Sequence, residues 1–393
     1  MADACLVELA RKANLFEETG MVPVMDYSAY VIKSDTLLTQ TLKDELKAAV
    51  ETLENLQRLR KDWQPDTDGK VLNVVDPSIW PLVYGTSKIL PDQHVPLEGC
   101  TDYCGMGDEI PQPPKPMLDR RRAMLLPLRM KAFGTRFQWL PCNIYLTDEK
   151  PRISIYVNNL HPVRDAPLYS IIERLIEKSL PAWDIVFRST DEAFQVSRFE
   201  PIKAIKYRCS APETSHVRGK GFFKRGVQTT SPGAMVGRDV TQIQVIVKMA
   251  NIHLAPEKPN YEGSPWQIEG QAIERICAKA LFCYDRDNIA DTPINFRTQG
   301  NREKLGTKLD CIYDDWPSIE RVFAMEVHGT RLQDIGSVLT REGRAIFYAN
   351  VYQNRLGPFE LTDKTSPGHC KMLALFLVDP MNPISSTANI PPQ

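Results

Sequence analysis

The sequence lacks a strong charge of either sign and lacks long apolar runs. Its 48 Lys and Arg residues nearly balance 49 Asp and Glu residues, for a net charge of −1, so no overall field attracts nucleic acid or an anionic membrane. No run of 18 or more apolar residues is present, which argues against a membrane-spanning helix. The first residues, MADACLVELARKANLFEETG, carry charges throughout, so we expect no signal peptide and a cytoplasmic location.

Glycine is scarce relative to proline, with 21 glycines against 30 prolines, which indicates ordered, turn-rich connections. The nine cysteines are odd in number and scattered, as is typical of a reduced intracellular protein. The segment RGKGFFKRG at 218–226 has the spacing of neither a Walker loop nor a dinucleotide fingerprint. We interpret it as a loop beside the active site; as a lid, it would bring Arg218, Lys220 and Lys224 to an anionic substrate. The basic cluster Arg120, Arg121 and Arg122 is interpreted as a solvated turn or a structural ion-pair cluster rather than as a site for an anionic ligand.

Apolar periodicity predicts two amphipathic helices, at 39–62 with Thr39 or Thr41 as the N-cap and at 168–180. The C-terminal half instead has β-rich runs separated by turn residues, with too few helices between them for a parallel fold. These runs are TQIQVIVKMANIHL, ERICAKALFCYD, GSVLTREGRAIFYANVYQN and KMLALFLVD. The pattern favours an antiparallel sandwich or barrel.

Long phrases of this chain resemble, in order, those of a large fungal domain family related to the 2-oxoglutarate/Fe(II) oxygenases. They include VLNVVDPSIWPLVYG, YVNNLHP, QVIVKMANIHLAPEKPNYEG, VYQNRLGPFELTDKTSPGH and KMLALFLVDPMNPISSTANIPPQ. The resemblance implies an α+β fold with a double-stranded β-helix, that is, a jelly-roll or cupin-like barrel with buttressing helices. We expect an α-rich region over 1–140 packed on a barrel domain over 141–393, with one shared core.

The family's iron site is altered in this sequence. The resemblance implies a His-x-Asp/Glu pair, a second histidine and an arginine that binds 2-oxoglutarate, but these positions hold Gln267, Glu269, Asn354 and Cys370. None of the six histidines forms His-x-Asp/Glu. Because Fe(II) sites favour imidazole nitrogen and amide oxygens are weaker donors for this ion, we expect neither Fe(II) nor 2-oxoglutarate as a cofactor.

The remodelled site suits a cofactor-independent enzyme of fungal specialised metabolism that catalyses a cyclisation, isomerisation, elimination or pericyclic step. Without a nearby cation, Glu269 is expected to have a raised pKa and to act as general acid or base. Gln267 and Asn354 are expected to donate hydrogen bonds to the substrate, a small fungal metabolite. The residues that we expect to bind the substrate are Cys370, Asn158, Lys248, Asn251 and Arg297.

Two alternatives remain open at this point. The chain is either a working Fe(II)/2-oxoglutarate oxygenase with unusual ligands or a non-catalytic partner of an active homologue, and homo-oligomerisation is left open as well. Two residues near the altered positions do not rescue the site. His369 is interpreted as a satisfied turn or core histidine, and Arg355 points to the face opposite Asn354 if its strand is regular.

Overall fold

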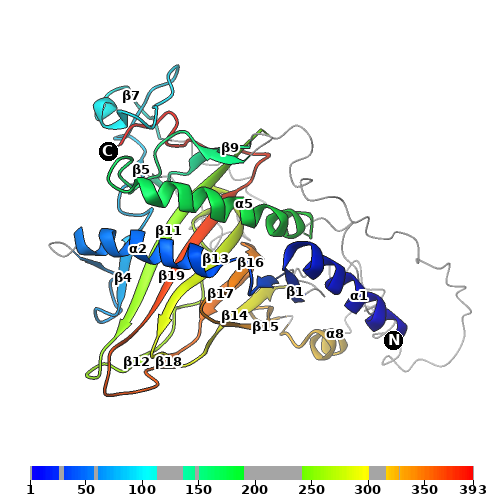
Figure 1. Ribbon diagram of the computed structural model, residues 1–393. Helices are drawn as coiled ribbons and strands as arrows, with labels where there is room; N and C mark the ends of the chain where they lie inside the picture. The colour runs from blue at the N-terminus through cyan, green and yellow to red at the C-terminus, as the bar shows by residue number, and fades with distance from the viewer. Residues whose placement is uncertain are drawn as a thin grey trace, which may run out of the picture.

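A computed structural model describes residues 2–25, 31–56, 61–112, 136–146, 150–189, 241–300, 316–326 and 328–392. The basic cluster at 120–122 and the predicted lid at 218–226 lie outside the described residues. Within these ranges the protein is built around one large antiparallel sheet with helices on one face, and a second, smaller sheet accompanies it (Figure 1).

The large sheet has ten strands, and every pairing in it is antiparallel, as the β-rich runs predict. Eight of them lie side by side in the order β1 (Val22–Met25), β2 (Val31–Ser34), β16 (Ala345–Ala349), β13 (Ile276–Asp287), β19 (Gly368–Val378), β11 (Gln242–Leu254), β4 (Val71–Val75) and β3 (Asp62–Trp63). Strand β9 (Cys142–Leu146) pairs with the first part of β11, and β10 (Pro151–Ile153) pairs with β9. The three long central strands therefore come from the C-terminal half of the chain.

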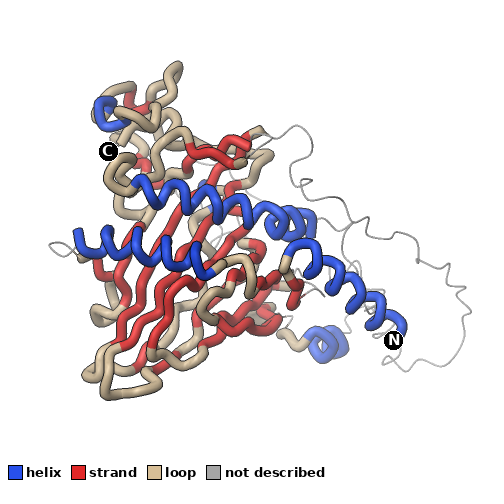
Figure 2. The backbone as a smooth tube through the Cα atoms, in the orientation of Figure 1, coloured by secondary structure: helices blue, strands red, loops and turns tan. Residues whose placement is uncertain are grey.

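Helices α2 (Gln40–Leu56) and α5 (Ala166–Ser189) cover one face of this sheet, and Figure 2 shows both in front of the strands. Their apolar residues follow helical spacing and are buried: Leu42, Leu46, Val50, Leu53, Leu168, Ile171, Ile172, Leu175 and Ile176. The Thr39 hydroxyl accepts a hydrogen bond from the Leu42 amide at 3.3 Å, so Thr39 is the predicted N-cap of α2. Both predicted helices are present, but their ends differ from the prediction. Asp62, the predicted last residue of the first helix, lies in strand β3 instead, and α5 extends nine residues beyond its predicted end at residue 180.

A second sheet has three strands in the order β15 (Leu332–Thr340), β14 (Thr292–Gln299) and β17 (Gln353–Leu356). Gln267 adds an isolated antiparallel bridge to Asn354 at the edge of β17. Among the described strands, β1 and β3 end the large sheet and the sheets do not close into a barrel. The predicted α+β class is confirmed, whereas the double-stranded β-helix stays a prediction.

The remaining elements are helix α1, which has 18 residues, and a set of shorter helices and strands. They are α1 (Ala2–Thr19), β5 (Leu82–Val83), β6 (Lys88–Ile89), the 3-10 helix at Cys100–Tyr103, β7 (Asp108–Glu109), β8 (Phe137–Gln138), β12 (Asn260–Tyr261), the 3-10 helix at Ala272–Glu274, α8 (Trp316–Phe323) and β18 (Phe359–Glu360). Strands lie before residue 140 as well as helices, and β1, β2, β3 and β4 form both ends of the large sheet. The region predicted as α-rich is thus part of the same sheet as the C-terminal strands, while the boundary at 140 stays a prediction.

Candidate functional site

A cavity of about 510 Å³ lies between the large sheet and strands β14 and β17 of the second sheet. Strand alternation gives its floor, because side chains two residues apart on a strand share a face. The floor residues are Lys248, Ala250 and Ile252 on β11, Met372, Ala374 and Phe376 on β19, and Lys279 and Leu281 on β13. The loop at 64–71, the segment at 261–269 and strands β14 and β17 supply the other walls. A cavity of this size suits a small organic molecule.

The three residues predicted to be catalytic meet on one wall of this cavity. The Gln267 amide donates to the Asn354 carbonyl at 3.0 Å, and the Asn354 amide donates back at 2.9 Å. The Asn354 side-chain Nδ2 also donates to the Gln267 carbonyl at 3.3 Å. Glu269 follows two residues after Gln267 and faces the same space. The family resemblance therefore placed Asn354 correctly beside Gln267, although 87 positions separate the two residues along the chain.

Glu269 is fixed from several sides. Its Oε1 accepts hydrogen bonds from Gln267 Nε2 at 3.0 Å and from Lys279 Nζ at 2.7 Å. The Asn350 side chain accepts from the Glu269 amide at 3.1 Å and donates to the Glu269 carbonyl at 2.9 Å. No donor among the described residues contacts Oε2. One carboxylate oxygen is thus fully engaged, and the other is available to a ligand.

Lys279 overturns the expectation that Glu269 lacks a cation. The two side chains form an ion pair that is almost fully buried, with 7% of Lys279 and 6% of Glu269 exposed. Burial alone would raise the pKa of Glu269, but the charges of Lys279 and Lys248 and the hydrogen bonds outweigh burial and lower it. Burial would lower the pKa of Lys279, yet the Glu269 charge raises it well above its ordinary value. Both groups are charged at neutral pH, so the predicted rise in the pKa of Glu269 is wrong.

Aromatic rings surround the Lys279 ammonium. Its Nζ lies 5.3 Å from the centre of the Phe376 ring and 5.6 Å from that of Tyr348, distances at which a cation is attracted to a ring face. The Tyr348 side chain is fully buried, and burial raises its pKa to about 12. Tyr348 therefore stays neutral beside the ion pair.

Lys248 is the second lysine on the cavity floor, and Lys70 lines the cavity from the loop at 64–71. The Lys248 Nζ lies 5.8 Å from the centre of the Trp139 ring. Among the described residues no carboxylate lies within ion-pair distance of this ammonium. Of the five residues predicted to bind substrate, Lys248 alone lines this cavity.

Asn158 and Asn251 are not on the cavity wall. Asn158 Nδ2 donates to the Trp80 carbonyl at 2.8 Å and so fixes a loop. Asn251 lies on β11 with the opposite orientation to Lys248 and Ile252, toward helix α2, where it donates to Glu54 and accepts from the Tyr284 hydroxyl at 3.3 Å. Successive side chains on a strand point to opposite faces, so Asn251, next to the floor residues of β11, lies on the helix-covered face.

Arg297 and Cys370 also lie away from the cavity. Arg297 donates to Gln353 Oε1 at 2.6 Å and stacks 4.2 Å from the centre of the Trp266 ring. Cys370 is fully buried in a small apolar cluster, with its Sγ 3.9 Å from that of Cys283. Position 370 shares a face with the cavity floor but lies beneath the chain at 356–361, because β19 continues past the cavity.

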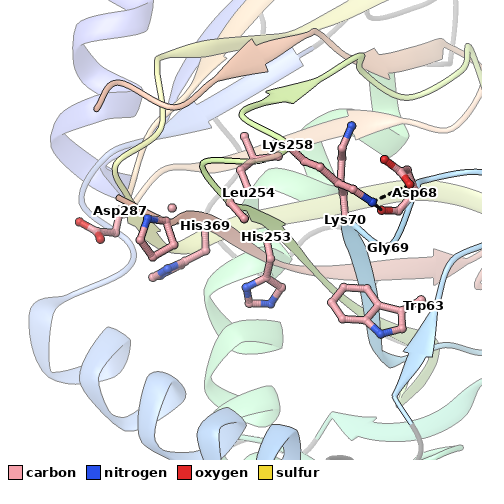
Figure 3. A pocket seen from close by; sticks show the side chains of 12 residues that line it. Trp63, Asp68, Gly69, Lys70, His253, Leu254, Lys258, Asp287 and His369 are labelled. Atoms are coloured by element: carbon pink, nitrogen blue, oxygen red, sulfur yellow. Dashed lines mark hydrogen bonds and ion pairs between the residues drawn. The ribbon is translucent and has the colours of Figure 1, made fainter. Parts of the chain in front are cut away.

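A more open pocket of about 620 Å³ lies near the ends of β3, β11 and β19 (Figure 3). The His253 and His369 rings lie near each other there, 6.3 Å between centres, with Trp63 on the other side of His253. His369 Nε2 is 2.9 Å from Asp285 Oδ2, so the interpretation of His369 as a satisfied histidine is confirmed. Burial lowers the pKa of His253 to about 4, and His253 is therefore neutral at physiological pH.

The residues around Glu269 do not fit an Fe(II) ion. The single carboxylate is already bound by an ammonium, which would repel a metal cation, and the other two positions offer neutral amides. Within the described part of the chain, no group of three or more His, Cys, Asp and Glu side chains could hold a metal ion.

Arg355 lies 4.8 Å from the centre of the Trp266 ring and away from the cavity. No helix among the described residues is long and apolar enough to cross a membrane.

These features define a mixed α+β protein with a cavity between antiparallel sheets and a buried ammonium–carboxylate pair at its floor. The chain belongs to the family described as "Protein of unknown function (DUF4246)", whose model matches residues 1–393. No curated protein matches it.

Several solved structures are similar to this chain at low identity. The Fe(II)/α-ketoglutarate-dependent dioxygenase TqaL is 9% identical, over 100% of this chain and 94% of that chain, with a TM-score of 0.35. IDO from Bacillus thuringiensis is 9% identical, over 94% and 93% of the two chains, with a TM-score of 0.30. A bsmA homolog from Methylobium petroleophilum PM1 is 10% identical, over 94% and 92%, with a TM-score of 0.30. None of these matches assigns an activity to this chain.

Proposed function

We propose that this chain is an enzyme that works without iron on a diverged double-stranded β-helix, with its active site in the cavity around Glu269. The observation that carries the proposal is the buried ion pair in which Lys279 Nζ lies 2.7 Å from Glu269 Oε1. A buried carboxylate needs a positive partner, and here a lysine on β13 supplies it. The remaining residues suit proton transfer better than oxidation.

Glu269 acts as the general base in this proposal. Its Oε1 is held by two donors, while Oε2 has no donor among the described residues and its lone pairs are available to a substrate proton. A carboxylate with a lowered pKa is a weak base. When a substrate oxygen accepts a hydrogen bond from Lys279, however, the ammonium holds Oε1 less strongly and the basicity of Glu269 rises.

Lys279 stabilises the charge that forms on the substrate. A proton leaves a carbon next to a carbonyl for Glu269 Oε2, the electron pair moves onto the carbonyl oxygen, and the ammonium stabilises that oxyanion. Return of the proton to another carbon completes an isomerisation, departure of a leaving group completes an elimination, and attack on an internal electrophile completes a cyclisation. Because its pKa is raised, Lys279 stays protonated and does not act as an amine nucleophile.

The first test is the metal content of protein purified without added iron, followed by anaerobic titration with Fe(II) and 2-oxoglutarate. We expect far less than one metal ion per chain and no heat of 2-oxoglutarate binding. One tightly bound iron per chain that supports 2-oxoglutarate binding would contradict the proposal and favour an oxygenase with unusual ligands.

The second test measures proton transfer without knowledge of the natural product. Carbonyl compounds with acidic C–H groups are incubated in D₂O, and loss of the C–H signal is followed by ¹H NMR with wild-type protein and with Glu269→Gln. The substitution keeps the side-chain volume and an acceptor for Lys279, and circular dichroism verifies the fold. We expect exchange with wild-type protein and none above background with the variant; equal exchange by both would exclude Glu269 as the base.

A further inference from the structure

The charges at the cavity floor do not cancel. Lys279 and Glu269 form an ion pair at 2.7 Å, whereas Lys248 acts on Glu269 only at longer range, and its Nζ lies 5.8 Å from the centre of the Trp139 ring. Three exposed acidic residues, Asp66, Asp68 and Glu262, also line the cavity; Asp68 pairs with Lys258 at 2.7 Å, and none of the three lies within ion-pair distance of Lys248. The floor therefore carries one uncompensated positive charge that faces the space a ligand would occupy.

The surroundings of Lys248 are apolar. On β11 the next floor residue is Ala250, and the neighbouring strand β19 contributes Ala374 and Phe376. A charge beside apolar surface is costly unless it is paired or solvated. The complementary ligand has an anionic group for the ammonium and an apolar body for the surface next to it.

The two lysines are spaced for one small molecule. Lys248 pairs with Ala374, and Ala374 pairs with Leu281, so two inter-strand steps and two residues along β13 separate Lys248 from Lys279. With about 4.8 Å between strands and about 3.4 Å per residue, their Cα atoms are roughly 12 Å apart. Flexible side chains from both ends of this span can reach one ligand of modest size.

We infer that the substrate is an organic acid whose carboxylate pairs with Lys248 and whose reacting carbonyl lies at Lys279 and Glu269. This inference rests on the proposed function, since it assigns the substrate class of the same cavity. Lys248 binds and orients the acid, and the apolar floor selects acids with a hydrocarbon body over small, fully polar ones. A neutral amide of the same acid lacks the charge that Lys248 recognises.

The test compares each acid with its own primary amide. Benzoic, phenylacetic, hexanoic and octanoic acids and their amides are titrated against wild-type protein, with thermal shift as the first readout and calorimetry for the tightest probe. We expect at least one acid to bind about tenfold or more tightly than its amide, as for a hydrogen bond to a charged group. If no acid exceeds its amide, the inference is wrong.

Variants assign the effect to one ammonium. Lys248→Met should remove the preference for acid over amide, and Lys248→Arg should retain most of it because the charge remains. Lys364→Met, at an exposed lysine paired with Glu360, is the control and should bind as wild type. A preference that survives Lys248→Met would overturn the inference. The metal titration does not depend on this result. Failure of acid binding at Lys248 and failure of the iron-free mechanism are therefore distinguishable.

Discussion

Removal of the Lys279 ammonium is the sharpest perturbation that the structure suggests. In Lys279→Met, the aliphatic side chain still packs against the Phe376 ring, but the Glu269 carboxylate keeps only the hydrogen bond from Gln267 and remains 94% buried. Breaking a buried pair by removal of one partner costs about 3–5 kcal/mol, because the other charge stays behind without compensation. A domain with about 5–15 kcal/mol of total stability should still fold, with a clearly lower urea midpoint.

The cost should depend on pH in a defined direction. In wild-type protein the pKa of Glu269 is lowered below its ordinary value of 4.5, so its contribution to stability is present above pH 4.5 and is lost as the pH falls through the folded-state pKa. In Lys279→Met burial dominates and the folded-state pKa rises above 4.5. The penalty is then present at neutral pH and diminishes as the pH falls toward 4.5, where the carboxyl becomes protonated.

Urea unfolding followed by circular dichroism at pH 7 and pH 5 measures both effects. The double variant Lys279→Met/Glu269→Gln should recover most of the lost stability, because it removes the uncompensated charge. Lys364→Met is the control, since its pair with Glu360 is exposed and should contribute at most about 0.5 kcal/mol. A cost below about 1 kcal/mol for Lys279→Met, or a double variant no more stable than the single one, would refute the reasoning.

Three further predictions concern residues outside the ion pair. Cys370→Arg should not create 2-oxoglutarate binding and should destabilise the protein by several kcal/mol, because it buries an unpaired guanidinium in an apolar cluster; urea unfolding and calorimetry measure the two outcomes. Asp285→Asn should lower the free energy of unfolding by about 2 kcal/mol at pH 7. Burial alone would raise the pKa of Asp285, but the hydrogen bonds and charges of His369 and Lys47 outweigh burial and lower it. The difference should vanish as the pH falls below 3.8, through the folded-state pKa, as urea titrations over pH would reveal. Trp183→Ala should cost about 3–5 kcal/mol, whereas Trp183→Phe should cost much less because the buried indole nitrogen has no hydrogen-bond partner among the described residues; thermal unfolding compares the two.

The long elements could be predicted from the sequence because each carries its own pattern. The spacing of Leu42, Leu46 and Val50 identifies α2, and alternation in the apolar runs identifies β11 and β13. Residues 151–160, PRISIYVNNL, have the alternation that predicts a strand, and Ile153 and Ile155 are buried, but strand β10 ends at Ile153. Two-residue strands such as β5 and β6 leave no such pattern, because pairing with distant segments creates them.

The site could be predicted where local order determines it and not where tertiary packing does. Gln267 and Glu269 share a face through their spacing, and Asn354 reaches them by strand pairing. Lys279 was missed, although a lysine inside the apolar run ERICAKALFCYD signals either an exposed position or a buried ion pair. The sequence does not say what lies opposite it. Cys370 was expected at the site because the family resemblance aligns it with the arginine that binds 2-oxoglutarate, but its burial depends on how far β19 extends beneath other segments.

An ammonium beside Glu269 supports different chemistry from that of a metal ion at the same place. A metal ion offers open coordination positions and binds several oxygen ligands at once. An ammonium offers three hydrogen-bond donors, and Lys279 uses one of them on Glu269 Oε1. The others can reach a substrate oxygen without breaking the pair, so the same charge that keeps Glu269 ionised can also stabilise an oxyanion. Binding of iron at Glu269 would require displacement of Lys279, and the two modes of chemistry are therefore mutually exclusive in this cavity.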